Sequence, residues 1–157
     1  MAAPACECPR VRVAALIVRD GQVVCVRHRK GDDVYHLLPG GGVGWGETLE
    51  HALVREVAEE TGLAVEVGRP LIVSDTIDPS GTRHVVNITF EASVTRGDLS
   101  DSPDDPRVEA VDLIDLTDLG AIDLRPPLGE MLARAVREGQ AFEATYAGSL
   151  FTPDRSA

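Results

Sequence analysis

The feature that most constrains this chain is a run of glycines that ends directly before a helical pattern. Residues 39–46 read Pro-Gly-Gly-Gly-Val-Gly-Trp-Gly, so five of the eight positions are glycine. Because glycine loses the most conformational freedom on folding, we predict neither a helix nor a good strand here. The backbone of this segment is free to approach a ligand closely. From Thr48 to Thr61 apolar residues recur at three- and four-residue spacing, which predicts an amphipathic helix ended by Gly62.

The predicted helix carries three glutamates on one stripe. At about 100° per residue, Glu56, Glu59 and Glu60 fall within an arc of roughly 100°. A solvated acidic face is the ordinary interpretation of such a run. The glycine segment directly upstream and Arg55, one turn before Glu59, favour a metal site instead, because the arginine can hold one carboxylate in place. We expect the stripe to face outward into a cleft, where hard oxygen ligands suit Mg²⁺ or Mn²⁺ bound to phosphate oxygens.

Strand patterns occupy most of the remaining sequence. An Asp-Gly pair at 20–21 and the segment Asp78-Pro79-Ser80-Gly81 predict turns, and Gly97–Arg107 predicts a long acidic loop. Strands and helices in this order predict an α/β sandwich with a mixed sheet, formed by one domain over residues 1–157 with loose tails at about 1–10 and 140–157. The predicted strands are Val11–Val18, Val23–Val26, Ala64–Asp75, Arg83–Val94 and Val108–Leu116, and Pro126-Pro127 opens a last helix.

The charge of the chain limits its partners. The 157 residues carry a formal net charge of -11, and the sequence pI is near 4.7. So acidic a surface repels phosphate backbones, which argues against DNA, long RNA and anionic membranes as partners. No apolar run approaches the ~20 residues of a membrane-spanning helix. Since the start of the sequence also lacks the pattern of a signal peptide, we expect a cytoplasmic protein.

The glycine segment and the helix together contain a demanding motif. Its residues are Gly41, Glu47, Arg55-Glu56-Val57, Glu59-Glu60 and Gly62-Leu63. This motif resembles the complete box of the Nudix (MutT-like) hydrolase family over residues 41–63, with no departure, and flanking segments from Val11 to Leu116 are consistent with the family. Seven demanding positions would match by chance roughly once in 10⁸–10⁹ starting points at background frequencies.

The resemblance implies a Nudix-type α/β/α sandwich with a mixed β-sheet and a set of site residues. It implies that Glu56, Glu59 and Glu60 bind Mg²⁺, or Mn²⁺ as a substitute, together with the backbone carbonyl of Gly40. By the same resemblance Arg55 orients a metal-binding carboxylate, and Glu47 braces the loop and the helix through Arg55.

The resemblance also implies the reaction. Family members hydrolyse a diphosphate linkage in a small nucleotide-like substrate by attack of water on phosphorus, and the metal neutralises charge and orients the water. Glu56 or Glu59 is a candidate for the base that takes the proton of the water. Some relatives use an acid from a later loop, which here offers Asp98, Asp101, Asp104 and Asp105.

The candidate substrate contacts lie outside the acidic stripe. One of them is Gly41 in the glycine segment, and the others lie elsewhere in the chain. Arg27 and Arg29 fall on the same face of a predicted strand, so both can reach one ligand, although a solvated strand end explains them equally well. Trp45 either stacks on a base or anchors its loop to the core. His84 and Asn87 lie on a strand that borders the predicted pocket, where a structural role is the simpler interpretation of each.

Two functions remain open at this stage. The first is hydrolysis of a nucleotide sugar such as ADP-ribose, a nucleoside triphosphate or oxidised dNTP, or a dinucleoside polyphosphate. The second is a catalytically silent Nudix-fold module that senses such a nucleotide. Pro79, sixteen residues after Leu63, resembles the proline that marks ADP-ribose pyrophosphatases, but its own turn explains it. Many relatives are homodimers, so the resemblance makes a homodimer possible.

Overall fold

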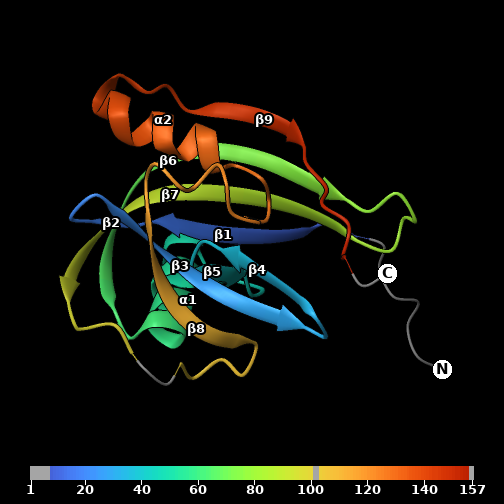
Figure 1. The fold of residues 1–157 in the computed structure, drawn as a ribbon, viewed down its shortest axis with the longest axis horizontal. Helices are drawn as coiled ribbons and strands as arrows, with labels where there is room; N and C mark the ends of the chain where they lie inside the picture. Colours follow the sequence, from blue (N-terminus) through green and yellow to red (C-terminus); the bar gives the residue numbers. More distant parts are fainter. Residues whose placement is uncertain (1–7, 101–102, 156–157) are drawn as a thin grey trace.

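The computed structural model describes residues 8–100 and 103–155 of the chain (Figure 1). Neither α-helix in these residues combines the length and apolar content of a membrane span. In chain order the elements are β1 (Arg10–Leu16), β2 (Val18–Arg19), β3 (Gln22–Lys30), β4 (Asp33–Leu37), β5 (Gly40–Gly42), α1 (Leu49–Thr61), β6 (Ala64–Ile77), β7 (His84–Arg96), β8 (Val108–Asp115), α2 (Gly129–Glu138), the 3₁₀-helix η1 (Gly139–Ala141) and β9 (Thr145–Ser149).

The strands form two sheets. The first has the order β5-β1-β7-β6-β9, in which β1 runs parallel to β7 and β6 runs parallel to β9, while the other two pairs are antiparallel. In the second sheet β3 pairs antiparallel with β2, β4 and β8. The predicted α/β fold with a mixed sheet is therefore confirmed. The sequence patterns did not show that the strands divide between two sheets.

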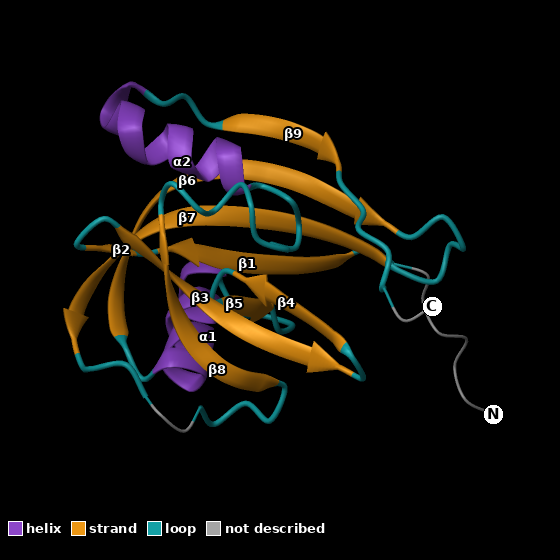
Figure 2. Ribbon diagram, in the orientation of Figure 1, coloured by secondary structure: helices purple, strands orange, loops and turns teal. Residues whose placement is uncertain are grey.

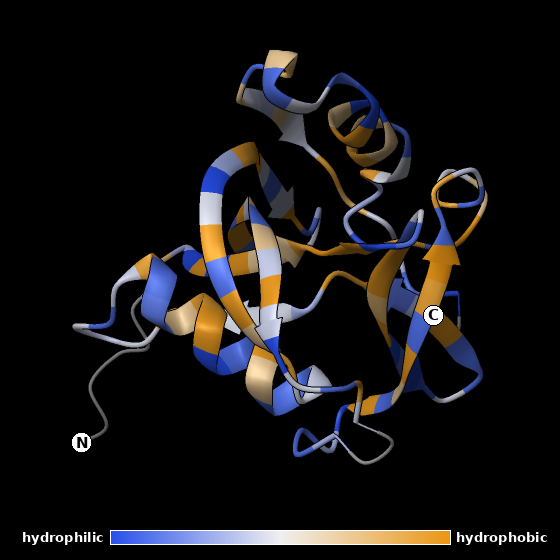
Figure 3. Cartoon of the chain, turned by 90° about the vertical axis from the view of Figure 1, so that its left-hand side faces the viewer, coloured by the Kyte–Doolittle hydropathy of each residue, from blue (hydrophilic) through white to orange (hydrophobic). Residues whose placement is uncertain are grey.

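Strand β1 is the centre of the packing, since its apolar run is buried on both faces. On one face Val13, Ala15 and Ile17 pack in the cluster that contains the apolar side of α1. On the other face Ala14 and Leu16 pack in the cluster that contains α2. The two helices thus cover opposite faces of the five-stranded sheet (Figure 2), and hydrophilic and hydrophobic residues alternate along the strands (Figure 3).

The predicted turns and the predicted acidic loop are present. Asp20 and Gly21, with φ of 49° and 79°, connect β2 to β3. In the turn after β6 the N–H of Gly81 donates to the carbonyl of Asp78 at 2.8 Å. The Gly97–Arg107 segment joins β7 to β8 without regular structure in its described part. Local turn preferences therefore placed these connections correctly.

The glycine segment differs from its prediction. Gly40–Gly42 forms strand β5 antiparallel to β1, with Gly41 opposite Val13 and Gly40 opposite Ala14. A Cβ on Gly40 would collide with the carbonyl of Val13, so only glycine allows the two strands to approach this closely. The prediction that the segment cannot be a good strand is wrong for these residues, because close pairing with β1 outweighs the low strand preference of glycine.

The C-terminal residues also differ from their prediction. The segment 140–157 was expected to be a loose tail, yet Phe142 is 1% exposed in the core beside α2. Strand β9 continues the sheet alongside β6, and Asp154 forms ion pairs with Lys30 and Arg125. These contacts join residues far apart in the sequence, so a short local pattern could not reveal them. Most of the expected N-terminal tail, residues 1–7, lies outside the described residues.

The burial of Phe142 generates a stability prediction. Phe142→Ala should lower the free energy of unfolding by about 3–5 kcal/mol, because it removes a fully buried ring and leaves a cavity. Phe151→Ala is the matched control, since this ring in the same segment is 38% exposed and should cost clearly less. Urea denaturation of the three proteins measures the difference, and equal midpoints would contradict the assignment of Phe142 to the core.

Candidate functional site

Helix α1 carries the acidic stripe and is capped at both ends. The side chain of Thr48 accepts a hydrogen bond from the N–H of His51 at 3.1 Å. Gly62 ends the helix with φ of 77°, a left-handed conformation that favours glycine. Between these caps Ala52, Leu53 and Val57 bury the apolar side against the sheet. This docking turns part of the acidic stripe toward β5.

Glu60 lies under the backbone of β5. Its side chain is 2% exposed, and its carboxylate accepts a hydrogen bond from the N–H of Gly40 at 2.9 Å. Burial raises the pKa of Glu60 to about 7, against the opposing effect of the Gly40 hydrogen bond. A neighbouring cation would stabilise the ionised form of a carboxylate buried in this way.

Glu56 lies beside it, 7% exposed. Its carboxylate accepts a hydrogen bond from Nη1 of Arg55 at 2.7 Å. Any side chain on Gly41 would overlap this carboxylate, so the glycine leaves the space that Glu56 occupies. Glu59 is exposed, and its carboxylate forms an ion pair with Nη1 of Arg55 at 3.6 Å. The stripe was expected to face outward into a cleft. Only Glu59 is exposed, because β5 covers Glu56 and Glu60, but Glu60 does line the cavity described below.

Arg55 connects the helix to the glycine segment. Its Nε and Nη2 donate to the two carboxylate oxygens of Glu47 at 2.8 and 2.9 Å, and Nη2 also donates to the carbonyl of Gly42 at 3.2 Å. Glu47 accepts in turn from the N–H of Gly44 at 2.9 Å. The hydrogen bonds from Arg55 and then Gly44 lower the pKa of Glu47 to about 2. The brace that the family resemblance implied is present.

The donor set fits a hard divalent cation. Glu56, Glu59 and Glu60 supply oxygen donors, and Arg55 is shared with Glu47, so negative charge is in excess. Within residues 8–100 and 103–155, no three side chains of metal-binding type are already gathered around one point. In this arrangement Arg55 donates to Glu56 and the Gly40 N–H donates to Glu60. Exposed Glu59 is free to move toward a bound ion.

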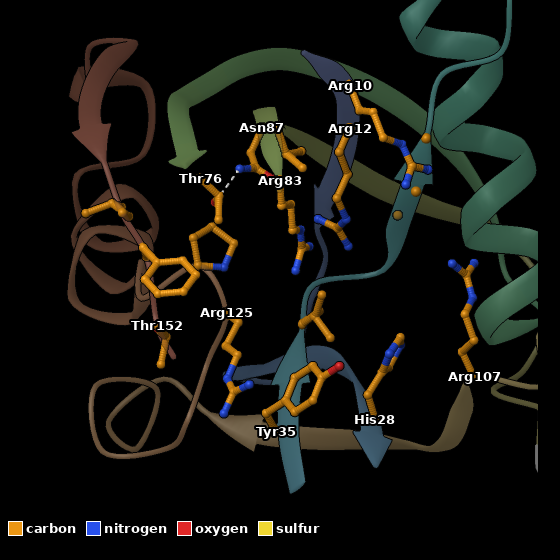
Figure 4. A pocket seen from close by; sticks show the side chains of 18 of the residues that line it. Arg10, Arg12, His28, Tyr35, Thr76, Arg83, Asn87, Arg107, Arg125 and Thr152 are labelled. Carbon is orange, nitrogen blue, oxygen red and sulfur yellow. Dashed lines mark hydrogen bonds between the residues drawn. The ribbon is translucent and has the colours of Figure 1, made fainter. Parts of the chain in front are cut away.

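A cavity of about 290 Å³ opens next to these acids (Figure 4). Its walls come from β1, β3, β4, β5, the facing ends of β6 and β7, and the C-terminal segment. Gly40–Gly42 and Glu60 form the wall nearest α1. The charged side chains that line it are mostly basic: Arg10, Arg12, Arg83, Arg107 and Arg125, against Glu60 and Asp154.

Two of the predicted substrate contacts line this cavity, and the others do not. Gly41 and the buried Asn87 are part of its wall, and Asn87 donates to the hydroxyl of Thr76 at 3.0 Å. His84 lies outside the lining and pairs with Asp75 at 3.3 Å. Trp45 is fully exposed, so it does not anchor its loop to the core.

Arg27 and Arg29 share one face of β3, as alternation predicts, but that face points away from the cavity. Both bind Glu109, at 3.1 and 2.7 Å. His28, between them, points the opposite way into the cavity, opposite Tyr35 in the register. The alternation was therefore right, but the sequence could not show which face meets the cavity.

The candidate acids of the Gly97–Arg107 loop are not equivalent. Asp105 is held by Arg107 at 2.6 Å, and this hydrogen bond lowers its pKa. The loop is tied to the end of α1, because the N–H of Asp104 donates to the carbonyl of Glu59 at 3.0 Å. Asp98 is exposed. Asp101 lies outside the described residues.

The arginines of the cavity were not among the predicted substrate contacts. Arg10 and Arg12 alternate at the start of β1, a spacing of two that places both on one face of a strand. This alternation is a signal that the sequence contained. Arg83, Arg107 and Arg125 had no such signal, because they lie in or next to connections whose course only the fold sets.

Proteins of known family are similar to this chain in sequence. An ADP-ribose pyrophosphatase of Methanocaldococcus jannaschii is 36% identical over 102 residues, which cover 64% of this chain and 60% of the relative. A MutT-like protein of Streptomyces ambofaciens is 35% identical over 88 residues, covering 55% and 53%. The chain thus spans about half to three-fifths of the length of these two relatives.

Solved structures are similar over more of their length. A MutT NUDIX hydrolase from Burkholderia pseudomallei is 38% identical with a TM-score of 0.62, covering 71% of this chain and 87% of that one. A NUDIX hydrolase from Nitrosomonas europaea has a TM-score of 0.73 at 24% identity, covering 85% and 91%, and supports the fold alone. The NUDIX domain model matches residues 9–135. Since that match spans most of the chain and contains the acidic helix with its glycine strand, this protein belongs to the Nudix family.

Proposed function

We propose that the protein is a divalent-metal-dependent hydrolase that cleaves the diphosphate linkage of a nucleoside diphosphate derivative. The observation that carries the proposal is the burial of Glu56 and Glu60 under Gly40–Gly42, at the wall of a cavity lined with arginine. Family membership and relatives named as an ADP-ribose pyrophosphatase and as MutT proteins support it. The substrates to be tested are ADP-ribose, nucleoside triphosphates, oxidised dGTP and diadenosine polyphosphates.

The proposed metal site consists of Glu56, Glu59 and Glu60 with the carbonyl of Gly40. Mg²⁺ held by these residues, or Mn²⁺ in its place, would supply charge neutralisation for the diphosphate and lower the pKa of a bound water molecule. The chain's own residues then position the substrate. Arg55 and Glu47 hold helix and glycine strand together, so the acids keep a fixed relation to the cavity wall.

Proton transfer from the attacking water needs a carboxylate that the protein's own hydrogen bonds do not hold. Glu59 is exposed, and its one ion pair among the described residues is the 3.6 Å contact to Arg55, so it is the least constrained of the three acids. Glu56 is held by a 2.7 Å hydrogen bond from the same arginine. Asp105 is held by Arg107, which argues against this loop acid as the base. We therefore assign this role to Glu59.

Loss of a single acid is the first test. Glu59→Gln and Glu60→Gln should each lower kcat at least about 10²-fold with Mg²⁺, because the metal supplies electrostatic stabilisation of that size. Circular dichroism should show that both variants remain folded. Glu50→Gln, an exposed glutamate in the first turn of the same helix, is the control and should retain activity. Near-normal turnover by both variants would show that the acids have been misassigned.

Metal removal is the second test. EDTA should abolish hydrolysis, and adding Mg²⁺ to the metal-free protein should raise its melting temperature, because a ligand that binds only the native state stabilises it. The double variant Glu56→Gln/Glu60→Gln should show no such rise. A wild-type protein that hydrolyses no member of the panel with Mg²⁺ or Mn²⁺, yet binds one tightly, would instead be a nucleotide sensor.

A further inference from the structure

Five arginines from separate parts of the chain meet in the cavity, although the protein has a net charge of -11. Arg10 and Arg12 come from β1, and Arg83 comes from the connection between β6 and β7 (Figure 4). Arg107 precedes β8, and Arg125 lies between β8 and α2. Positive charge concentrated in one cavity of a negatively charged protein indicates that the cavity binds an anion.

Two of the five are neutralised by the protein itself. Arg107 is bound by Asp105 at 2.6 Å. Arg125 is bound by three aspartates at 2.8 to 3.0 Å: Asp33, Asp123 and Asp154.

The other three have no such partner. Arg10, Arg12 and Arg83 form no ion pair with any residue in 8–100 or 103–155. Arg10 and Arg83 are therefore the cavity's unmatched positive charge, whereas Arg12 is close enough to Glu60 and Glu56 for their negative charge to raise its pKa.

Arg12 is a buried cation with charges of both signs around it. Its guanidinium donates to the carbonyl of Leu38 at 2.9 Å. Burial lowers its pKa, Glu60 and Glu56 raise it, and the nearby Arg83 and Arg107 lower it. Cations that face one another away from water are tolerated best when an anion lies between them. Arg12 therefore lies between the acids of α1 and the basic part of the cavity.

His28 adds an unsatisfied group to the same wall. Its Nε2 is buried and has no hydrogen-bond partner among the described residues. Burial and then Arg107 lower the pKa of His28, so the ring is neutral near pH 7. A neutral imidazole offers one N–H, which can donate to an oxygen of a bound anion. A buried polar atom without a partner in a cavity is consistent with a ligand that completes it.

The cavity offers little for stacking a base. One face of Tyr35 is covered by Arg125, whose Cζ lies 4.2 Å from the ring centroid. His28 lies against the same ring at 5.7 Å. Phe151, partly exposed, is the other aromatic ring among the lining residues. Charge and hydrogen bonding therefore dominate the chemistry of the wall.

We propose that this cavity binds a second anionic group, a phosphate ester on the part of the substrate that is not cleaved. The inference rests on the proposed function, because the acids of α1 and their metal account for the diphosphate that is cleaved. Arg10 and Arg83 line the cavity without an ion pair to any described residue, and guanidinium groups match phosphate oxygens. The preferred substrates are then diphosphates that carry an additional phosphate, rather than those with a neutral second half.

The test compares ligands that differ by phosphate groups. One pair is ADP-ribose and its 2′-phosphate, and the other is dephospho-coenzyme A and coenzyme A, which differ by a 3′-phosphate ester on the ribose. Calorimetry in EDTA measures binding without metal or hydrolysis, and kcat/KM is then measured with Mg²⁺. In at least one pair the more phosphorylated ligand should bind about tenfold more tightly, the usual effect of a charge-assisted hydrogen bond. Arg83→Gln should remove this preference, so that the two members of each pair bind with similar affinity.

Arg96→Gln is the matched control, because Arg96 is exposed at the opposite end of β7 and does not line the cavity. It should keep the preference. Equal binding within both pairs by the wild type would overturn the inference, as would an Arg83→Gln variant that keeps the preference. If the preference appears in EDTA but nothing is hydrolysed with Mg²⁺, the proposed hydrolysis fails and the anion site stands. If the substrates are hydrolysed but neither pair shows a preference, the proposed hydrolysis stands and the anion site fails.

Discussion

The close pairing of β5 with β1 is the constraint on which the site depends. Because Gly40 and Gly41 have no side chains, β5 lies directly against β1, and the carboxylates of Glu56 and Glu60 reach its backbone. Larger residues at these positions would push either β5 or α1 away. Carboxylate burial is costly unless hydrogen bonds or cations compensate for it, and the Gly40 N–H and Arg55 compensate only in part.

The remaining elements arrange opposite charges around this pairing. Helix α1 carries excess negative charge on one side of β5, while β1 and the β6–β7 connection bring Arg12 and Arg83 to the cavity on the other side. Under the proposed function, this division of charge suits a substrate whose cleaved diphosphate lies at the metal site and whose other phosphate group lies among the arginines. The cavity lies where strand ends of both sheets meet the C-terminal segment, so both sheets and the residues that follow β9 enclose it.

Local patterns predicted much of the fold, and their failures have a common cause. The amphipathic helix, the strand buried on both faces and the two tight turns depend on short-range periodicity and turn preferences, and these were found as predicted. Strand β5 and the ordered segment around Phe142 were missed. Both are held by contacts between residues distant in sequence, which local preferences do not contain.

By itself the sequence determined the fold class, the family and the three acids with their arginine, because helical spacing and the motif specify them without tertiary information. Only the tertiary structure decided which faces meet the cavity. It buried Glu56 and Glu60 but left Glu59 exposed. It also turned Arg27 and Arg29 toward Glu109 and brought five other arginines together. Those outcomes depend on how two sheets pack, since a strand's alternation fixes which residues share a face but not what that face contacts.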